Sequence, residues 1–183
     1  MANMIKSQPR FGPILVGLLL LFPLLDAGTA QAADTDVVIN EIMYHPDTDC
    51  ELEEYVELFN RSATDAVNLS GWRFSEGAPY TFPNNTILPP RGYLVVCGNR
   101  DAFNRYYSTP TVTLLWPWSG KLANDGEDIV LVNGSAVTID RVRYNDKRPW
   151  PISPDGGGPS LELVTANDDN SSAGAWRAAV SAH

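Results

Sequence analysis

Short apolar stretches separated by turn-forming residues repeat along the chain and predict β-structure. Each stretch is rich in Val, Ile, Tyr, Phe, Trp or Thr, and each is bounded by Gly, Pro, Asn or Asp. Strands this short, with turn signals about every 8 to 12 residues, favour a sandwich or a barrel. Nine strands are expected, over residues 37–44, 55–59, 72–75, 80–82, 93–97, 112–116, 129–132, 137–144 and 160–164.

Two turn motifs fit this pattern of strands. Asn133-Gly134 lies between two of the predicted strands and is a strong hairpin signal. The run Pro89-Pro90-Arg91-Gly92 suits a tight turn before the strand at 93–97, with Gly92 free to take a positive φ. Short connections of this kind are typical of antiparallel sheets.

The helical signal is weak. Residues 101–107 predict one or two helical turns with Asp101 as the N-cap, which places Phe103 and Tyr106 on the same side. The Ala-rich segment 172–182 is expected to cap the domain. Neither segment is long enough for the crossover of a parallel sheet, so we expect a single antiparallel domain.

The first 32 residues follow a different pattern, that of a secretion signal. Lys6 and Arg10 form a basic start, residues 14–25 form an apolar run, and Ala30-Gln31-Ala32 is a small-x-small cleavage motif. The run is shorter than the roughly 20 apolar residues that a membrane span needs. We therefore expect cleavage between Ala32 and Ala33, and the alternative is a signal that stays uncleaved as an anchor.

The chain after cleavage is expected to hold one domain over residues 33–178 and a short tail over 179–183. A domain of this size buries about 70% of the surface that its unfolded chain exposes. No second long apolar run follows the signal. We expect a secreted or periplasmic protein with no membrane anchor.

The charge of the chain narrows the choice of partners. The 183 residues include 13 basic and 22 acidic side chains, which gives a net charge of −9 at pH 7. An acidic surface repels the phosphate backbone, so nucleic acid is not an expected partner. Two histidines and two cysteines leave few ligands for zinc or for histidine-based catalysis.

The two cysteines allow two interpretations. In an oxidising compartment Cys50 and Cys97 could form a disulfide that stabilises the fold by about 3–4 kcal/mol. Alternatively, Cys97 ends an apolar strand and is a small buried hydrophobe. Sequence does not give the Cα separation that a disulfide requires, so both interpretations stay open.

Ten short motifs follow one another along residues 37–178. They are VINEIMYHP at 38–46, EYVELFN at 54–60, LSGW at 69–72, YTFP at 80–83, LPPRGYLVV at 88–96, GKLANDGE at 120–127, IDRVRY at 139–144, PWP at 149–151, GPSLE at 158–162 and WRA at 176–178. In sequence and spacing they resemble the lamin tail domain family, in its secreted bacterial branch. The resemblance implies an all-β, immunoglobulin-like antiparallel β-sandwich of about 8–9 short strands. It also implies an interaction module, because lamin tail domains resemble binding domains more than enzymes.

The acidic loop at 45–57 is a candidate metal site. His45, Asp47 and Asp49 could ligate a divalent cation, and Ca²⁺ in particular takes six to eight oxygen ligands from flexible loops. The spacing matches no EF-hand loop. We favour the alternative, a solvated acidic loop with Glu57 on the outward face of its strand.

Asn40 and Glu41 interrupt an otherwise apolar strand. We expect one of them to point inward and to be held by backbone groups or by Arg73, Arg141 or Arg143. A general acid–base pair would need a second carboxylate opposite and a cleft, and the sequence indicates neither. A structural network is therefore the favoured interpretation.

Proline-flanked tryptophans are the candidate binding surface. Trp116, Trp118 and Trp150 lie beside prolines in predicted loops, and Lys147 and Arg148 are close by in sequence. Exposed aromatic rings can stack on carbohydrate or fill a pocket on a partner protein. If these rings are instead buried, they belong to the core of the sandwich.

These observations favour a secreted, non-catalytic binding module for a protein or a cell-envelope polymer such as a surface polysaccharide. No Gly-x-Ser-x-Gly, His-Glu-x-x-His or phosphate-binding glycine motif occurs in the sequence, so no catalytic residue and no cofactor is expected. The alternative is an accessory metal-dependent hydrolase, or an adhesion-type domain stabilised by Ca²⁺, that uses the loop at 45–57. A third interpretation is a structural spacer.

Overall fold

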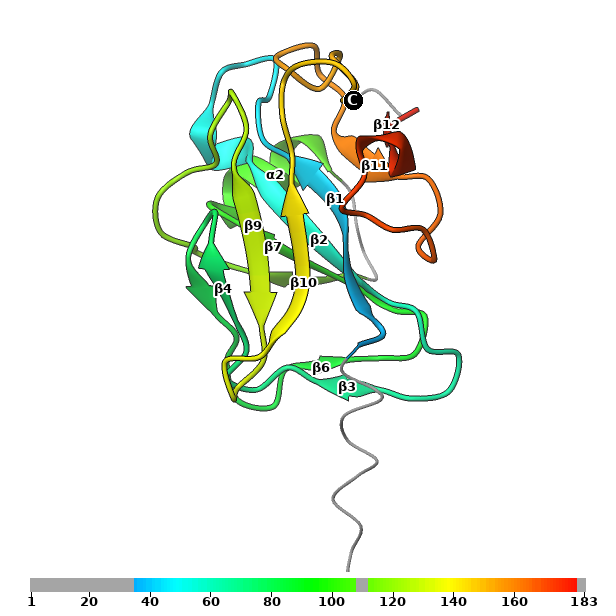
Figure 1. Ribbon diagram of the computed structural model, residues 1–183. Helices are drawn as coiled ribbons and strands as arrows, with labels where there is room; N and C mark the ends of the chain where they lie inside the picture. Colours follow the sequence, from blue (N-terminus) through cyan, green and yellow to red (C-terminus); the bar gives the residue numbers. More distant parts are fainter. Residues whose placement is uncertain (1–34, 108–111, 181–183) are drawn as a thin grey trace, which may run out of the picture.

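Two β-sheets pack face to face in the computed structural model, which describes residues 35–107 and 112–180 (Figure 1). The first sheet has the order β12-β11-β1-β2-β7-β8 and the second the order β10-β9-β4-β5, while β3 and β6 pair at one end. The all-β sandwich expected from the sequence is confirmed. The strands are β1 (Val37–Met43), β2 (Tyr55–Asn60), β3 (Val67–Asn68), β4 (Arg73–Glu76), β5 (Tyr80–Thr81), β6 (Ile87–Leu88), β7 (Tyr93–Cys97), β8 (Thr113–Leu115), β9 (Asp128–Val132), β10 (Thr138–Arg143), β11 (Leu161–Leu163) and β12 (Trp176–Ala178).

All nine predicted strands have a counterpart, whereas β3, β6 and β12 were not predicted. β3 and β6 have two residues each, too few for an alternating pattern to be visible. β12 lies in the Ala-rich segment that was expected to cap the domain. A 3₁₀ turn at Ala173–Ala175 precedes it, and its Trp176 side chain is buried.

The expectation of purely antiparallel strands is wrong at one edge of the first sheet. β8 pairs with β7 in parallel, with Val95 opposite Leu114. The connection between the two strands has 15 residues, which is long enough for a crossover. It includes the helix α2 (Arg100–Tyr106). The N-cap of α2 is Asn99 and not Asp101, because Asn99 Oδ1 accepts hydrogen bonds from the next two free backbone N–H groups.

The two turn motifs form, but other residues take the left-handed conformation. The hairpin between β9 and β10 forms at Asn133, whose Oδ1 accepts two loop N–H groups, and Ala136 has a φ of 62°. In the second turn Arg91 has a φ of 54°. Gly92 is needed there for space, since a Cβ at that position would lie 2.4 Å from Pro89 Cγ.

The main core lies between the two sheets, and a hydrogen-bonded corner joins them. β1 is bulged between Ile39 and Glu41. Asp140 on β10 accepts the Ile39 N–H at 2.6 Å, and Asn170 donates to both Ile39 O and Asp140. Burial raises the pKa of the Asp140 carboxyl, and these donated hydrogen bonds oppose that effect. At the bulge the Ile39 N–H is therefore satisfied by the opposite sheet and the Ile39 C=O by the loop between β11 and β12.

A second, smaller apolar cluster lies under α2, on the outer side of the six-stranded sheet. It is formed by Met43, Tyr55, Val95, Cys97 and Phe103. The sheet is therefore covered on both faces near β2 and β7. Beside α2 the rest of its outer face is left uncovered. No helix among the residues that the structure describes is both long and apolar enough to cross a membrane.

Candidate functional site

The tryptophans predicted to form a binding surface are mostly core residues. Trp118 is 6% exposed and Trp150 is 8% exposed, and both belong to the main core. Trp150 packs near Trp176, with ring centroids 6.1 Å apart. Trp116 is 42% exposed, and the Arg100 Cζ atom lies over its ring, 4.7 Å from the ring centroid. The predicted surface is therefore wrong for Trp118 and Trp150, because both rings pack into the main core.

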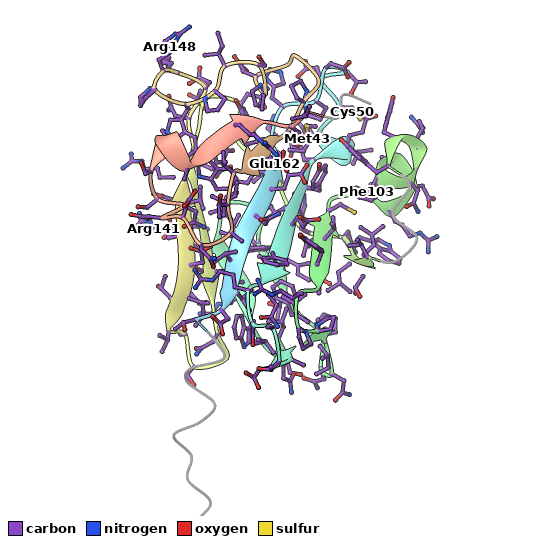
Figure 2. All side chains as sticks on the ribbon, turned by 90° about the vertical axis from the view of Figure 1, so that its right-hand side faces the viewer. Met43, Cys50, Phe103, Arg141, Arg148 and Glu162 are labelled. Carbon is purple, nitrogen blue, oxygen red and sulfur yellow. The ribbon has the colours of Figure 1, made fainter. Side chains whose placement is uncertain are left out.

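The two basic residues of that prediction are exposed, and Lys147 Nζ lies 3.7 Å from Asp146 Oδ1. Lys147 and Arg148 lie in the turn before Trp150, whose backbone N–H bonds to Lys147 O. Figure 2 shows Arg148 projecting from a loop at one end of the molecule, away from the strands. No aromatic surface joins them there, since the Trp150 ring points into the core.

The predicted metal ligands do not converge. His45 Nδ1 lies 2.6 Å from Asp155 Oδ1, and His45 Nε2 lies 3.5 Å from Asp49 Oδ1. Asp47 instead lines a hollow beside Glu53 and Tyr107. Across residues 35–107 and 112–180, no group of three His, Cys, Asp or Glu side chains is arranged to hold a metal ion.

The two cysteines are free thiols in the structure, so the disulfide interpretation is wrong and the buried alternative is confirmed for Cys97. Cys97 is fully buried beneath α2, while Cys50 is half-buried before the 3₁₀ turn at Glu51–Glu53. Burial raises the pKa of the Cys97 thiol to about 11. A thiol of that pKa carries little thiolate and has low reactivity.

A row of three glutamates crosses the outer face of the six-stranded sheet. Glu162 on β11 pairs with Glu41 on β1, and Glu41 pairs with Glu57 on β2. Arg177 on β12 and Val95 on β7 continue the row at its two ends. Figure 2 looks onto this sheet, with Glu162 labelled in its upper part. We call Glu162, Glu41 and Glu57 the glutamate row.

Each member of the glutamate row is held by a neighbour. Arg177 donates to both oxygens of Glu162 at 3.0 and 3.1 Å. Glu41 Oε1 accepts from Tyr55 Oη and from Ser160 Oγ, each at 2.5 Å. Glu57 Oε1 accepts from Asn40 Nδ2 at 2.9 Å. The expected arginine partners for Asn40 and Glu41 are therefore wrong, because β1 turns these side chains outward after its bulge.

Burial and like charge both act on Glu57. Burial is the larger cause and raises its pKa to about 7, while Glu41 and Glu162 add repulsion and the Asn40 hydrogen bond opposes the rise. Burial also raises the pKa of Tyr55, and so does the charge of Glu41. The row thus concentrates negative charge that the fold only partly neutralises.

Aromatic rings form the wall beside the glutamate row. The Tyr55 ring packs edge-on against Phe103 and Tyr107, with centroid distances of 5.4 and 5.0 Å. Phe103 stacks with Tyr107 at a centroid distance of 4.7 Å. α2 carries Phe103 and ends just before Tyr107. Tyr107 is the ring that stacks on Phe103, whereas Tyr106, which was expected on the same side of the helix as Phe103, is exposed.

The glutamate row and the aromatic wall line an open pocket of about 350 Å³. Ala179 and Val180, which follow β12, also line it. Two further hollows exist among the described residues. One of about 240 Å³ lies beyond Tyr107. Another, of about 500 Å³, lies at the end of the four-stranded sheet, and the small exposed part of Trp150 lines it.

The chemistry of the 350 Å³ pocket differs from the sequence expectation in one respect. Glu57 stands directly opposite Glu41 beside a cleft, so the expectation that no second carboxylate faces Glu41 is wrong. Both ring nitrogens of His45 lie beside carboxylates, Nδ1 beside Asp155 and Nε2 beside Asp49. The arrangement can hold a cation and shield it with aromatic rings.

The sequence carried only part of the signal for this pocket. Alternation along β2 places Tyr55 and Glu57 on one face, and Glu57 was expected to point outward. That Glu162 lies beside Glu41 could not be read from the sequence, because the two are 121 positions apart and only strand order brings them together.

Comparison with known proteins agrees with this architecture. The chain matches the family described as Lamin Tail Domain over residues 30–146. A comparison with curated proteins gives no significant match. β11 and β12 follow the matched region; β11 pairs with β1 and β12 pairs with β11, so both extend the same sheet. With an immunoglobulin-like sandwich and a family match over more than half of its length, the chain belongs to the lamin tail domain family.

Proposed function

We propose that this protein is an exported, non-catalytic interaction module that holds a protein or a cell-envelope polymer on the outer face of its six-stranded sheet. The observation that carries the proposal is the glutamate row beside the aromatic wall, around an open pocket. Family membership supports it, since lamin tail domains are immunoglobulin-like and typically not enzymes.

The glutamate row is costly to the fold, which supports a role in binding. Like charges directly opposite one another on neighbouring strands are destabilising. Arg177 neutralises Glu162, but no described cation pairs with Glu41 or Glu57. Local violations of stability rules are expected at functional sites, where a ligand supplies the missing interaction.

Export rests on the first 32 residues. The basic start, the apolar run over 14–25 and the Ala30-Gln31-Ala32 motif together support cleavage before Ala33. Mass analysis of the protein from intact cells and from their surroundings tests this. A chain beginning at Ala33 outside the cytoplasm supports export, and an uncut chain retained in the cytoplasm overturns it.

A pocket-filling substitution tests the binding role. Ala179→Trp places an indole ring in the 350 Å³ pocket without removing a described side-chain contact. Ala66→Trp, at an exposed position before β3, is the matched control. The purified chain is titrated with envelope fractions and secreted proteins from its source cells. Saturable binding that Ala179→Trp removes and Ala66→Trp retains supports the proposal; equal binding by both variants overturns it.

The same preparations test the hydrolase alternative. Two carboxylates across a cleft are also used by glycoside hydrolases, in which one acts as an acid. Product release from envelope polymers is therefore measured with and without Ca²⁺, Mg²⁺ and Zn²⁺. Turnover that Glu57→Gln abolishes would replace the binding role with catalysis.

A further inference from the structure

We infer that the pocket beside the glutamate row takes a primary ammonium group, in particular the side chain of a lysine on a protein partner. This inference rests on the proposed function, since it names the chemistry of the ligand at the same face. It follows from the charge of the pocket, from the oxygens that remain open and from the aromatic wall.

The charge of the pocket requires a cationic ligand. Glu162 is matched by Arg177 through two hydrogen bonds. Glu41 and Glu57 receive only neutral donors, namely Tyr55, Ser160 and Asn40. Glu162 and Arg177 line the pocket as a matched pair, and Glu41 and Glu57 line it without a described cation of their own. A ligand carrying positive charge removes their mutual repulsion.

The open oxygens favour an ammonium over a guanidinium. The described donors to Glu41 and to Glu57 all bond to Oε1, and among the described residues no donor bonds to Oε2 of either carboxylate. A guanidinium binds best to both oxygens of one carboxylate, as Arg177 already does with Glu162. An ammonium group has three donors around one atom and can reach single oxygens on two carboxylates.

The aromatic wall and the size of the pocket indicate what carries the ammonium group, namely a single side chain with an apolar stem. Tyr55 and Phe103 are buried, and Tyr107 is half-buried at the pocket edge. Aromatic faces attract cations and also pack against the methylene stem of a lysine. At about 350 Å³ the pocket is at the lower end of the range for small-ligand sites, which suits one side chain.

The first experiment uses small probes on the wild-type chain, so it depends on no variant. Amide NMR shifts are followed during titration with Nα-acetyl-lysine methylamide, its norleucine and arginine counterparts, and glucosamine. We expect saturable shifts near Glu57 and Tyr107 with the lysine probe, weaker ones with arginine, and none with norleucine. Equal shifts with norleucine, or no shifts with lysine, overturn the inference, and tighter binding of glucosamine assigns the pocket to an amino-sugar polymer instead.

The second experiment uses Glu57→Gln, with Glu76→Gln on β4 as a matched control on an exposed carboxylate of the other sheet. We expect Glu57→Gln to weaken the lysine probe about tenfold or more, because it removes a charged acceptor, and Glu76→Gln to change nothing. The fold of each variant is checked by its thermal melt. Unchanged affinity in a folded Glu57→Gln variant overturns the inference.

The pH dependence of lysine-probe binding is an independent test. Binding of the lysine probe is expected to weaken from pH 8 to pH 6, because the Glu57 carboxyl, with its pKa of about 7, becomes protonated and neutral. The affinity of Glu57→Gln is expected to stay flat over that interval. The other charged or titratable groups around Glu57 are Glu41, Glu162, Arg177, Tyr55, Tyr93 and Tyr107.

The two proposals fail separately. Envelope or protein binding that Ala179→Trp removes, without any binding of the lysine probe, leaves the interaction module in place and overturns the ammonium ligand. Binding of the lysine probe by a chain that has no partner at this face overturns the module. An unaltered lysine titration in Ala179→Trp places the ammonium outside the pocket and overturns the inference.

Discussion

The stability of this domain is expected to fall as the pH rises from 5 to 9, because Glu54 is buried. Glu54 lies just before β2 and is 1% exposed, and its Oε2 accepts the Leu122 N–H at 2.8 Å. Burial is the main cause that raises the pKa of Glu54 to about 8, and Glu51 and Glu127 add repulsion. The Leu122 hydrogen bond and Lys121 act in the opposite direction.

The sign follows from proton linkage. Between pH 4.5 and pH 8 the folded chain holds a proton on Glu54 that the unfolded chain has lost, so the free energy of unfolding decreases as the pH rises. Each pH unit in that interval costs about 1.4 kcal/mol, so the full effect is up to about 5 kcal/mol. For a domain of this size that corresponds to a Tm change of roughly 10–20 °C.

Glu54→Gln isolates this contribution. Glutamine keeps an acceptor for the Leu122 N–H but cannot ionise. Urea unfolding of the wild type and of Glu54→Gln is measured at pH 5, 7 and 9, with Glu76→Gln as the exposed control. We expect the two to agree within about 1 kcal/mol at pH 5. The variant should be the more stable by several kcal/mol at pH 9. Parallel stability curves for Glu54→Gln and wild type would refute this reasoning.

Three further predictions follow from the described contacts. Trp118→Ala is expected to lower the free energy of unfolding by about 3–5 kcal/mol, whereas Trp116→Ala costs less than about 1 kcal/mol; similar urea midpoints would contradict the burial of Trp118. Iodoacetamide should modify Cys50 but not Cys97 in the folded chain and both after unfolding; an unfolded chain that resists labelling would indicate a disulfide. Asn99→Ala should cost about 1 kcal/mol in a thermal melt, because it removes the N-cap of α2, and an unchanged melt would contradict that role.

Local sequence patterns were enough to locate most of the strands. Short stretches rich in β-branched and aromatic residues mark β1, β2, β7 and β9 without any knowledge of their neighbours. The hairpin at Asn133 was also visible, since a turn depends on a few adjacent residues. Where the pattern failed, the competing effect was local as well: Asn99 is a better N-cap than Asp101 because its side chain reaches the free N–H groups.

Burial of individual side chains could not be read in the same way. Trp118 and Trp150 lie beside prolines, which favour loops, yet both rings fill the space between the sheets. The distance between Cys50 and Cys97 likewise depends on how the loop before β2 meets β7. In each case the chain near the residue is compatible with either outcome, and packing against distant elements selects one.

The identity of most strands, the family and the outward direction of Glu57 were thus available from residue order alone, because strand formation and alternation are short-range properties. The glutamate row was not. It exists because the antiparallel pairings of β11 with β1 and of β1 with β2 bring Glu162, Glu41 and Glu57 side by side. Registers between distant strands are set by the packing of the whole sandwich, so the site itself emerges only when the chain is folded.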